Sequence, residues 1–379
     1  NISRSEFLPS VTLSGTLDSS QSTNRTNQSN ESLADTNLDT ETKKLEVEQK
    51  IFQGFQGYNS LKKSDLEISQ ATFQLKQLEQ ETILDTVIAY SDLLFKIKNN
   101  KFNIDNANLF ERQVESDSAR LQKGEITLTD LAQAESSLAK ANANLISAET
   151  ELLTAKTNFK RVIGIDAPKD INDINFDVIL PNSLNEALEI SLANNPELVI
   201  SQLDFKIAQK NLNIEKAKFS PSASINYSKS EIDELSSSIN KADKESVKAT
   251  ITWPIIKGGK NYSSIKKSKY RKEQNRLILK DIENKVKTET TNAWSIYRSA
   301  KSILNATKSQ LKAAEIANEG ITLEYDSGNT RTTLDVIQSR SLLLDARIDN
   351  AKAERDFIVS KFRLLTQLGN LSINTIKNT

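Results

Sequence analysis

The chain of 379 residues contains no cysteine and no histidine, so it lacks the side chains that enzymes use most often. Ser–His and Cys–His nucleophiles, thiolate reactions, disulfides and every metal site built on His or Cys are thereby excluded. Asp, Glu, Lys and Tyr remain available for acid–base work. The sequence shows no Gly-rich phosphate loop, no metal-binding cluster and no convergent acid pair. We therefore expect no enzymatic activity, no catalytic residue, no cofactor and no metal site.

The residues best suited to ionic interactions gather in two short segments of similar pattern. One runs from Gly124 to Asp130 and the other from Tyr325 to Asp335. Each contains a glycine, Gly124 or Gly328, that we expect at a turn between two long helices. The planar guanidinium of Arg331, in the second segment, suits a carboxylate partner. In the plainer interpretation, the aspartates are solvated helix residues and the glycines only permit a turn.

Long stretches without glycine or proline predict the elements that carry these segments. Neither residue type occurs between Gly57 and Gly124, between Gly124 and Gly164, or between Gly259 and Gly320. A helix over most of 59–122 would be about 95 Å long at ~1.5 Å per residue. A helix of that length is a rod and does not fit into an ordinary compact domain.

Two regions show a heptad pattern in which large and small residues alternate. A seam of this kind indicates a helix that coils around a partner, and its small residues let two backbones approach closely. An ordinary amphipathic helix is the alternative. The first seam consists of Leu131, Ala134, Leu138, Ala141, Leu145, Ala148, Leu152, Ala155 and Phe159. The second consists of Val336, Ser339, Leu343, Ala346, Asn350, Ala353, Phe357, Ser360 and Leu364.

An internal repeat organises the chain. Residues 51–64 align with 255–268 at an offset of 204, and seven of the fourteen positions are identical. Gly124 matches Gly328 at the same offset, and Asp130 matches Asp335 one residue later. We expect a first repeat at 1–166, a linker at 167–182, a second repeat at 183–371 and a C-terminal tail at 372–379.

Each repeat is expected to contain two strands and two long helices. In the first repeat we expect strands at about 9–18 and 43–52 and helices at about 59–122 and 126–163. In the second we expect helical structure at about 183–219, strands at about 221–229 and 246–254, and helices at about 262–326 and 333–368. The polar segments 18–42 and 229–245 are expected to be loops between the strands.

The strand segments alternate apolar and polar residues, as at Val11, Leu13 and Leu17 or at Val247, Ile251 and Trp253. This pattern fits a soluble sheet on a core, or a membrane barrel whose strands run ~9–11 residues. Four strands cannot close a barrel, because known single-chain barrels begin at about eight strands. Two copies would supply eight strands and three copies twelve, so a barrel requires an oligomer.

Composition narrows the class of protein further. Hydrophobic residues are 37% of the chain, charged residues 26% and the mean hydropathy is −0.49, which is too polar for a bundle of membrane-spanning helices. The composition is not that of a disordered chain either. The net charge is zero and no basic patch stands out, so we do not expect a nucleic-acid partner.

Over nearly its whole length the sequence resembles the TolC-like outer-membrane efflux proteins, the outer-membrane channels of tripartite efflux and type I secretion systems. The resemblance rests on FLP at 7–9, FSP at 219–221, WPIIKGG at 253–259, QKGEITLTDLAQAESSL at 122–138, ALEISLANNPEL at 187–198, YDSGNTRTTLDVIQSRSLLLDA at 325–346 and LGNL at 368–371. It implies that the first repeat lacks its opening helix. The chain lacks methionine, and we expect it to be a processed chain or a fragment.

The resemblance implies a mixed α and β membrane protein with two internal repeats and four strands per chain. Three copies would form a 12-stranded β-barrel in the outer membrane of a Gram-negative-type cell, in contact with its lipids. Long antiparallel coiled-coil helices would form a periplasmic α-barrel tunnel. The homotrimer would export small molecules or proteins together with a periplasmic adaptor (membrane fusion) protein and an inner-membrane pump. The alternative is a soluble or periplasmic coiled-coil structural or adaptor protein, which explains the heptads but not the strand pairs.

The resemblance also assigns roles to the two turn segments. It implies adaptor contact at Gly124, Glu125, Gly328 and Asn329. It implies a latch that holds the tunnel end closed, formed by Arg331, Tyr325, Thr129 and Asp130. The pore aperture would lie at Asp335 and Gln338. A ring of Asp335 carboxylates would favour cations, whereas the neutral Gln338 stands where the family often has a second acidic residue.

Overall fold

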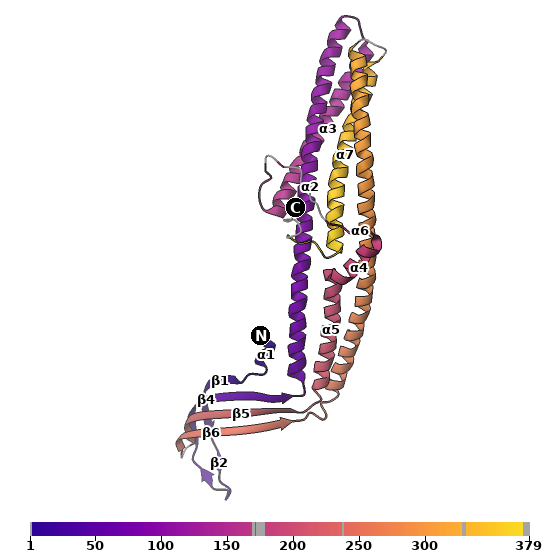
Figure 1. Ribbon diagram of the computed structural model, residues 1–379. Helices are drawn as coiled ribbons and strands as arrows, with labels where there is room; N and C mark the ends of the chain where they lie inside the picture. The colour runs from indigo at the N-terminus through magenta and orange to yellow at the C-terminus, as the bar shows by residue number, and fades with distance from the viewer. Residues whose placement is uncertain (1, 169–170, 172–178, 237–238, 328–330, 374–379) are drawn as a thin grey trace. The chain divides into compact units, whose positions relative to one another are not determined.

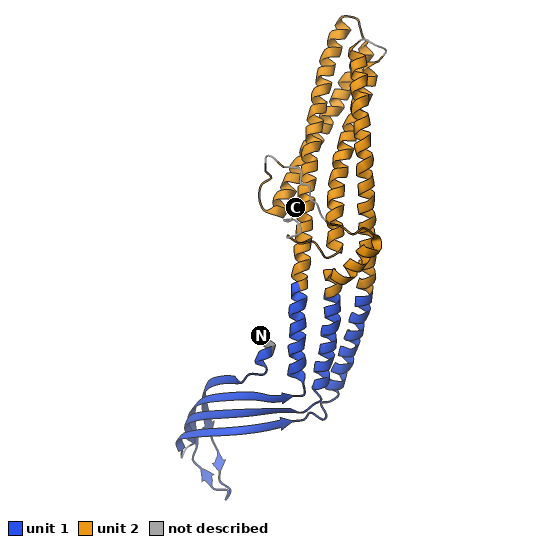
Figure 2. Ribbon diagram, viewed as in Figure 1, with its two compact units in different colours: residues 1–72, 200–280 blue, residues 73–199, 281–379 orange. Residues whose placement is uncertain are grey.

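The computed structural model describes residues 2–168, 171, 179–236, 239–327 and 331–373. The chain divides into two compact units, one of residues 1–72 and 200–280 and the other of residues 73–199 and 281–379 (Figure 2). Each unit therefore takes residues from both halves of the sequence. The repeats are units of sequence, whereas the compact units combine matching parts of the two repeats.

The first unit contains a four-stranded antiparallel sheet in the order β1-β4-β5-β6 (Figure 1). Its strands are β1 (Ser10–Ser22), β4 (Thr36–Gln53), β5 (Ser222–Ser236) and β6 (Ile239–Thr252). A short hairpin of β2 (Arg25–Thr26) and β3 (Ser32–Leu33) connects β1 to β4. The central pair, β4 with β5, joins the two repeats. The predicted mixed α and β fold with four sheet strands per chain is confirmed.

The strands are longer than the sequence analysis expected, and the predicted loops at 18–42 and 229–245 are therefore largely wrong. β1 continues to Ser22, β4 begins at Thr36, and the connection between β5 and β6 is short. The expectation relied on apolar alternation, but polar side chains also support strands when they interact across the sheet. Lys241 of β6 lies in ion-pair contact with Glu231 and, at 3.9 Å, with Asp233 of β5.

The two faces of the sheet differ in polarity. Val11, Val47, Tyr227 and Val247 are successive register partners and share one face. On the same face Leu13 and Ile251 are each 79% exposed, so none of the described residues covers these two side chains. The opposite face carries the register partners Ser10, Glu48, Asn226 and Lys248. The expected alternation is thus present, with a register shift between Lys50 and Phe52.

In the described part of the chain, six helices follow the strand pairs, and a short helix α1 (Ile2–Ser5) lies at the N-terminal end. They are α2 (Gln56–Gln122), α3 (Leu128–Ile163), α4 (Leu184–Asn194), α5 (Pro196–Ala217), α6 (Lys260–Asp326) and α7 (Thr333–Gln367). None of the described helices combines the length and apolar composition needed to cross a membrane.

The helical stretch expected at about 183–219 is divided between α4 and α5 at Asn195. Pro196 has no backbone N–H for the preceding helix, and the residue before a proline avoids the helical conformation. Asn195 instead caps α5, because its side-chain oxygen accepts hydrogen bonds from the backbone N–H groups of Glu197 (3.0 Å) and Leu198 (3.3 Å).

Small residues of both heptad seams are buried in the second unit. On α3 the small seam residues Ala134 and Ala141 are 0% and 2% exposed, and on α7 Ala346 is 0% exposed. Ala141 packs with Ala107 and Phe110 of α2 and with other residues in one apolar cluster. The seam prediction therefore identified the helix faces that pack.

Gly369 makes a close approach that only glycine permits. Its φ is +70°, and a Cβ there would collide with the backbone carbonyl of Asn194. The side chain of Asn195 also donates a hydrogen bond to the carbonyl oxygen of Gln367, at 3.0 Å. The end of α7 is thereby held against the junction of α4 and α5.

Candidate functional site

The turn between α2 and α3 contains the first group of predicted site residues. Gly124 adopts φ +76°, and the Glu125 carboxylate lies 3.3 Å from Nε of Arg120. Asp130 Oδ2 accepts hydrogen bonds from the backbone N–H (2.9 Å) and hydroxyl (2.7 Å) of Thr127. These bonds hold the pKa of Asp130 below its ordinary value. Thr129 is exposed in the first turn of α3.

Asp130 closes a capping box at the start of α3. The Thr127 hydroxyl accepts a hydrogen bond from the Asp130 backbone N–H, and the Asp130 carboxylate accepts one from the Thr127 backbone N–H. Two backbone donors at the start of the helix are thereby satisfied. The sequence signal for this cap is a threonine three residues before an aspartate, and the cap was not among the predictions.

The start of α7 repeats this arrangement. Asp335 Oδ2 accepts hydrogen bonds from the backbone N–H (2.8 Å) and hydroxyl (2.9 Å) of Thr332. These bonds, and the charge of Arg331, lower the pKa of Asp335. Gln338 lies one turn further on and is exposed. The predicted adaptor residues Gly328 and Asn329 lie outside the described residues.

Arg331 pairs with a carboxylate other than the one expected. Its Nε lies 2.6 Å from Glu324 Oε2, and this bond raises the pKa of Arg331. Within the described part of this single chain, no ion pair joins Arg331 to Asp130. Both members of the observed pair are exposed, and such pairs contribute only ~0–1 kcal/mol.

Tyr325 lies in a buried polar network near the same turn. It is 8% exposed, and its hydroxyl donates to Asp117 Oδ1 at 3.2 Å. The hydroxyl is also 3.1 Å from Thr333 Oγ1. The guanidinium of Arg120 lies 4.9 Å from the centre of the Tyr325 ring, a cation–π distance. The network therefore joins α2, α6 and α7.

Of this network only Tyr325 was predicted from the sequence, and Asp117 is its most deeply buried charged residue. It is 0% exposed, Oδ1 also accepts a bond from Gln113 Nε2 at 3.0 Å, and buried Oδ2 has no hydrogen-bond partner. Burial raises the pKa of Asp117. Arg340 extends the network by donating to Gln113 Oε1 at 3.1 Å, and burial lowers the pKa of Arg340. We call these residues the turn-end network: Gln113, Asp117, Arg120, Tyr325, Thr333 and Arg340.

The clearest signal for Asp117 lay in α2 itself. Buried polar residues recur along this helix at heptad-like intervals, which is unusual for a packed face. They include Gln80, Ser91, Asn99, Asn106, Gln113 and Asp117. The seams predicted from the sequence are those of other long helices, and this polar seam of α2 was not among them.

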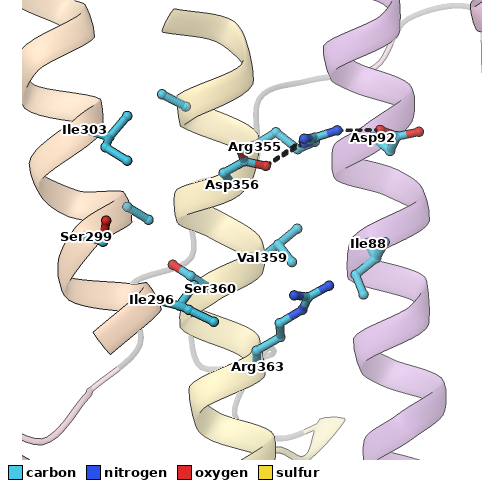
Figure 3. A pocket seen from close by; sticks show the side chains of 12 residues that line it. Ile88, Asp92, Ile296, Ser299, Ile303, Arg355, Asp356, Val359, Ser360 and Arg363 are labelled. Carbon is cyan, nitrogen blue, oxygen red and sulfur yellow. Dashed lines mark hydrogen bonds and ion pairs between the residues drawn. The ribbon is translucent and has the colours of Figure 1, made fainter. Parts of the chain in front are cut away.

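A cavity of about 460 Å³ lies among α2, α6 and α7, away from the turn-end network. Figure 3 shows its wall of aliphatic side chains, including Ile88, Ile303 and Val359, with Arg355 beside Asp92. Arg355 lies 2.9 Å from Asp92 and 2.7 Å from Asp356, so its charge is neutralised. The lining supplies apolar surface and one ion-paired cluster but no nucleophile–base pair among the described residues.

The chain matches a family model described as "Outer membrane efflux protein" over residues 1–165 and 187–370. It is similar to the outer membrane efflux protein BepC of Brucella suis biovar 1 (strain 1330), with 26% identity over 338 residues. That alignment covers 89% of this chain and 74% of BepC. The outer membrane protein TolC of Escherichia coli (strain K12) is 22% identical over 324 residues. This second alignment covers 80% of this chain but 64% of TolC, less than two thirds of its length.

Solved structures show the same fold. The Campylobacter jejuni CmeC outer membrane channel aligns with a TM-score of 0.81 at 15% identity, covering 100% of this chain and 81% of CmeC. The outer membrane protein VceC of Vibrio cholerae aligns with a TM-score of 0.79 at 16% identity, covering 97% of this chain and 88% of VceC. At these identities the likeness concerns the fold alone.

Proposed function

The chain belongs to the outer membrane efflux protein family, and from this premise we propose that it forms an exit duct for small molecules or proteins. Its location is the outer membrane of a Gram-negative-type cell. We ascribe no enzymatic reaction to it, because conduction requires a passage and not a reactive side chain. The soluble adaptor alternative leaves the exposed apolar face of the sheet without a purpose.

The observation that carries the proposal is a sheet with one apolar face and two unpaired edges. β1 and β6 form the edges of the order β1-β4-β5-β6 within the described chain. In lipid, every unpaired backbone N–H and C=O group costs several kcal/mol. The edges must therefore pair with other copies. Three copies supply twelve strands, which we propose close one barrel whose apolar face contacts lipid and whose polar face lines the passage.

The helical part is proposed to continue the passage and to meet its partners at the helical turns. Glu125 is exposed and Gly124 adopts a left-handed turn, so the α2–α3 turn presents backbone to solvent. We assign to it, and to Gly328 and Asn329 of the matching turn, the contact with a periplasmic adaptor. An inner-membrane pump would supply the energy. The assignment of these two partners is supported by the family to which the chain belongs and by the exposure of the α2–α3 turn.

The aperture is proposed to lie between copies at the start of α7. Asp335 uses Oδ2 in its capping box, whereas no bond to Oδ1 occurs within the described residues. Three such carboxylates could converge in a trimer, with Gln338 one turn further along. The latch of Arg331, Tyr325, Thr129 and Asp130 is likewise proposed to operate between copies. Arg331 would then exchange Glu324 for Asp130 of a neighbouring copy.

Assembly can be tested cleanly because the chain has no cysteine. The native mass of the purified protein in detergent should be that of a trimer. Leu13→Cys on β1, combined with single cysteines along residues 241–251 of β6, should form disulfides between copies at one register. Leu13→Cys with Leu45→Cys is the positive control, since these residues are register partners within the chain. A stable monomer with an intact sheet would exclude the proposed barrel.

A further inference from the structure

The beginning of α6 carries a local excess of positive charge that the proposed duct does not use. Residues 257–276 include eight lysines and arginines but one acidic residue, Glu273, although the whole chain has a net charge of zero. This local excess corrects the expectation that the chain has no basic patch, which rested on the net charge of the whole chain.

Three of these eight basic residues line one hollow on the exposed surface of the helix. Ser263, Lys266, Lys267, Tyr270, Arg271 and Gln274 are exposed and line a shallow hollow, which we call the basic face of α6. Within the described chain Glu273 pairs with Arg276 at 2.6 Å. Within the described chain, no carboxylate forms an ion pair with Lys266, Lys267 or Arg271. The charge of the basic face is therefore not neutralised by the described chain.

The first repeat provides an internal comparison at the offset of 204. Lys62 and Lys63 of α2 occupy the positions of Lys266 and Lys267. In α2, Lys62 pairs with Asp65 at 3.8 Å and Lys63 pairs with Glu67 at 3.4 Å. The first repeat therefore neutralises both lysines with carboxylates three and four residues later.

In the second repeat both carboxylates are replaced by positive charges. Lys269 stands at the position of Asp65, and Arg271 stands at that of Glu67. Each stabilising pair of α2 has thus become a pair of like charges on α6, which destabilises a helix about as much as an opposite pair stabilises it. An anion from outside the chain would remove this repulsion.

The segment between β6 and α6 indicates which kind of anion would bind. β6 belongs to the sheet with the exposed apolar face, and it ends eight residues before Lys260, where α6 begins. The intervening segment exposes Trp253, Ile255 and Ile256, and α6 exposes Tyr262 and Tyr270. Exposed aromatic residues together with basic residues, beside membrane-embedded structure, are typical of the membrane–water interface.

We propose that the basic face of α6 binds the phosphate headgroups of anionic phospholipids in the leaflet next to the helical part of the protein. The guanidinium of Arg271 can donate two parallel hydrogen bonds to a phosphate, and the lysines act as point charges. Ser263 and Gln274 supply neutral donors on the same face. The inference rests on the proposed function in one respect, that the sheet lies in lipid.

The decisive variant restores the charge pattern of the first repeat. K269D with R271E places carboxylates three residues after Lys266 and four after Lys267, as in α2, so the helix should remain folded. K308D with K312E is the matched control, because it makes the same change of net charge at two exposed positions in the second half of α6. The purified full chain in detergent is titrated with phosphatidylglycerol or phosphatidylcholine, and bound lipid is counted by native mass spectrometry.

We expect wild type and the control to bind phosphatidylglycerol more tightly than phosphatidylcholine, with a preference that salt weakens. The variant K269D with R271E should bind phosphatidylglycerol at least about tenfold more weakly than wild type. Each basic residue near an anionic surface contributes to the binding free energy, and this variant replaces two of them with acidic residues. Its ion conductance in planar bilayers should be unchanged. A failure of the proposed duct would instead abolish conductance in wild type.

Four results would overturn the inference. Wild type could show no preference for phosphatidylglycerol, or K269D with R271E could retain it. The same variant could lose its oligomeric state without any added lipid, in which case the basic face contacts a neighbouring copy. It could also change ion selectivity while keeping lipid affinity, in which case the face lines the duct.

Discussion

At Asp117, a buried carboxylate keeps one oxygen without a hydrogen-bond partner in the described chain. Gln113 and Tyr325 donate to the other oxygen, and their bonds favour the ionised form, but burial outweighs them and raises the pKa. Arg120 also opposes the shift, while Asp130 adds to it. A group whose pKa is higher in the folded state holds its proton more tightly there than in the unfolded state. Its contribution to stability is therefore greatest at low pH and declines as pH rises through the raised pKa.

Asp117→Asn should remove this pH dependence, because asparagine keeps the shape without the charge. We expect the variant to gain in melting temperature relative to wild type as pH rises from acidic to neutral. Thermal melting followed by helical circular dichroism across that range measures the difference. Parallel curves for the two proteins would show that Asp117 does not titrate between the folded and unfolded states.

Asp335→Asn tests the aperture, with Asp130→Asn as its structural counterpart in the matching capping box. Both carboxylates have lowered pKa values, so both boxes should lose stability as pH falls through the lowered pKa. In planar bilayers only Asp335→Asn should lose block by multivalent cations, because three carboxylates at a constriction create a strong negative potential. If both variants lose the same stability and Asp335→Asn is still blocked by multivalent cations, Asp335 acts only as a helix cap.

Among the elements, the seams of α3 and α7 leave little room at their small residues. We expect Ala141→Leu and Ala346→Leu to lower the free energy of unfolding by ~1–3 kcal/mol through overpacking. Asn142→Leu is the control, since Asn142 is exposed next to Ala141. Thermal or denaturant unfolding of the three variants makes the comparison. Similar stability for all three would contradict the packing of these seams.

The same elements show which structural features the sequence patterns could predict and which they could not. The large–small alternation predicted which faces of α3 and α7 are buried, because close packing constrains every third or fourth residue. The end of β5 and the beginning of β6 were predicted as a loop. Ion pairs such as Lys241 with Glu231 stabilise these parts of the strands in place of apolar contacts, so the apolar alternation is absent there. The turn-end network was missed because Asp117 meets Tyr325 across 208 residues of sequence, and local patterns carry no such information.

For the whole molecule, the sheet depends on both repeats. β4 of the first repeat pairs with β5 of the second along most of its length. Cleavage of the chain within 167–182 should therefore give halves that cannot complete the sheet alone. We expect sheet structure and assembly only when both halves are produced together, as measured by circular dichroism and native mass. A first half that forms a stable sheet by itself would contradict this dependence.

The pairing of β4 with β5 also has a consequence for the timing of biogenesis. The edge of β4 is covered only after β5 has been synthesised, because Glu41 of β4 pairs in register with Asp233 of β5. Ribosomes add ~5–20 residues per second, so the interval between the two strands is about ten to forty seconds of synthesis. Throughout that interval the hairpin of β1 and β4 has an open edge, which is a template for aggregation. The edge of β4 that β5 covers in the folded sheet is therefore unpaired until β5 has been synthesised.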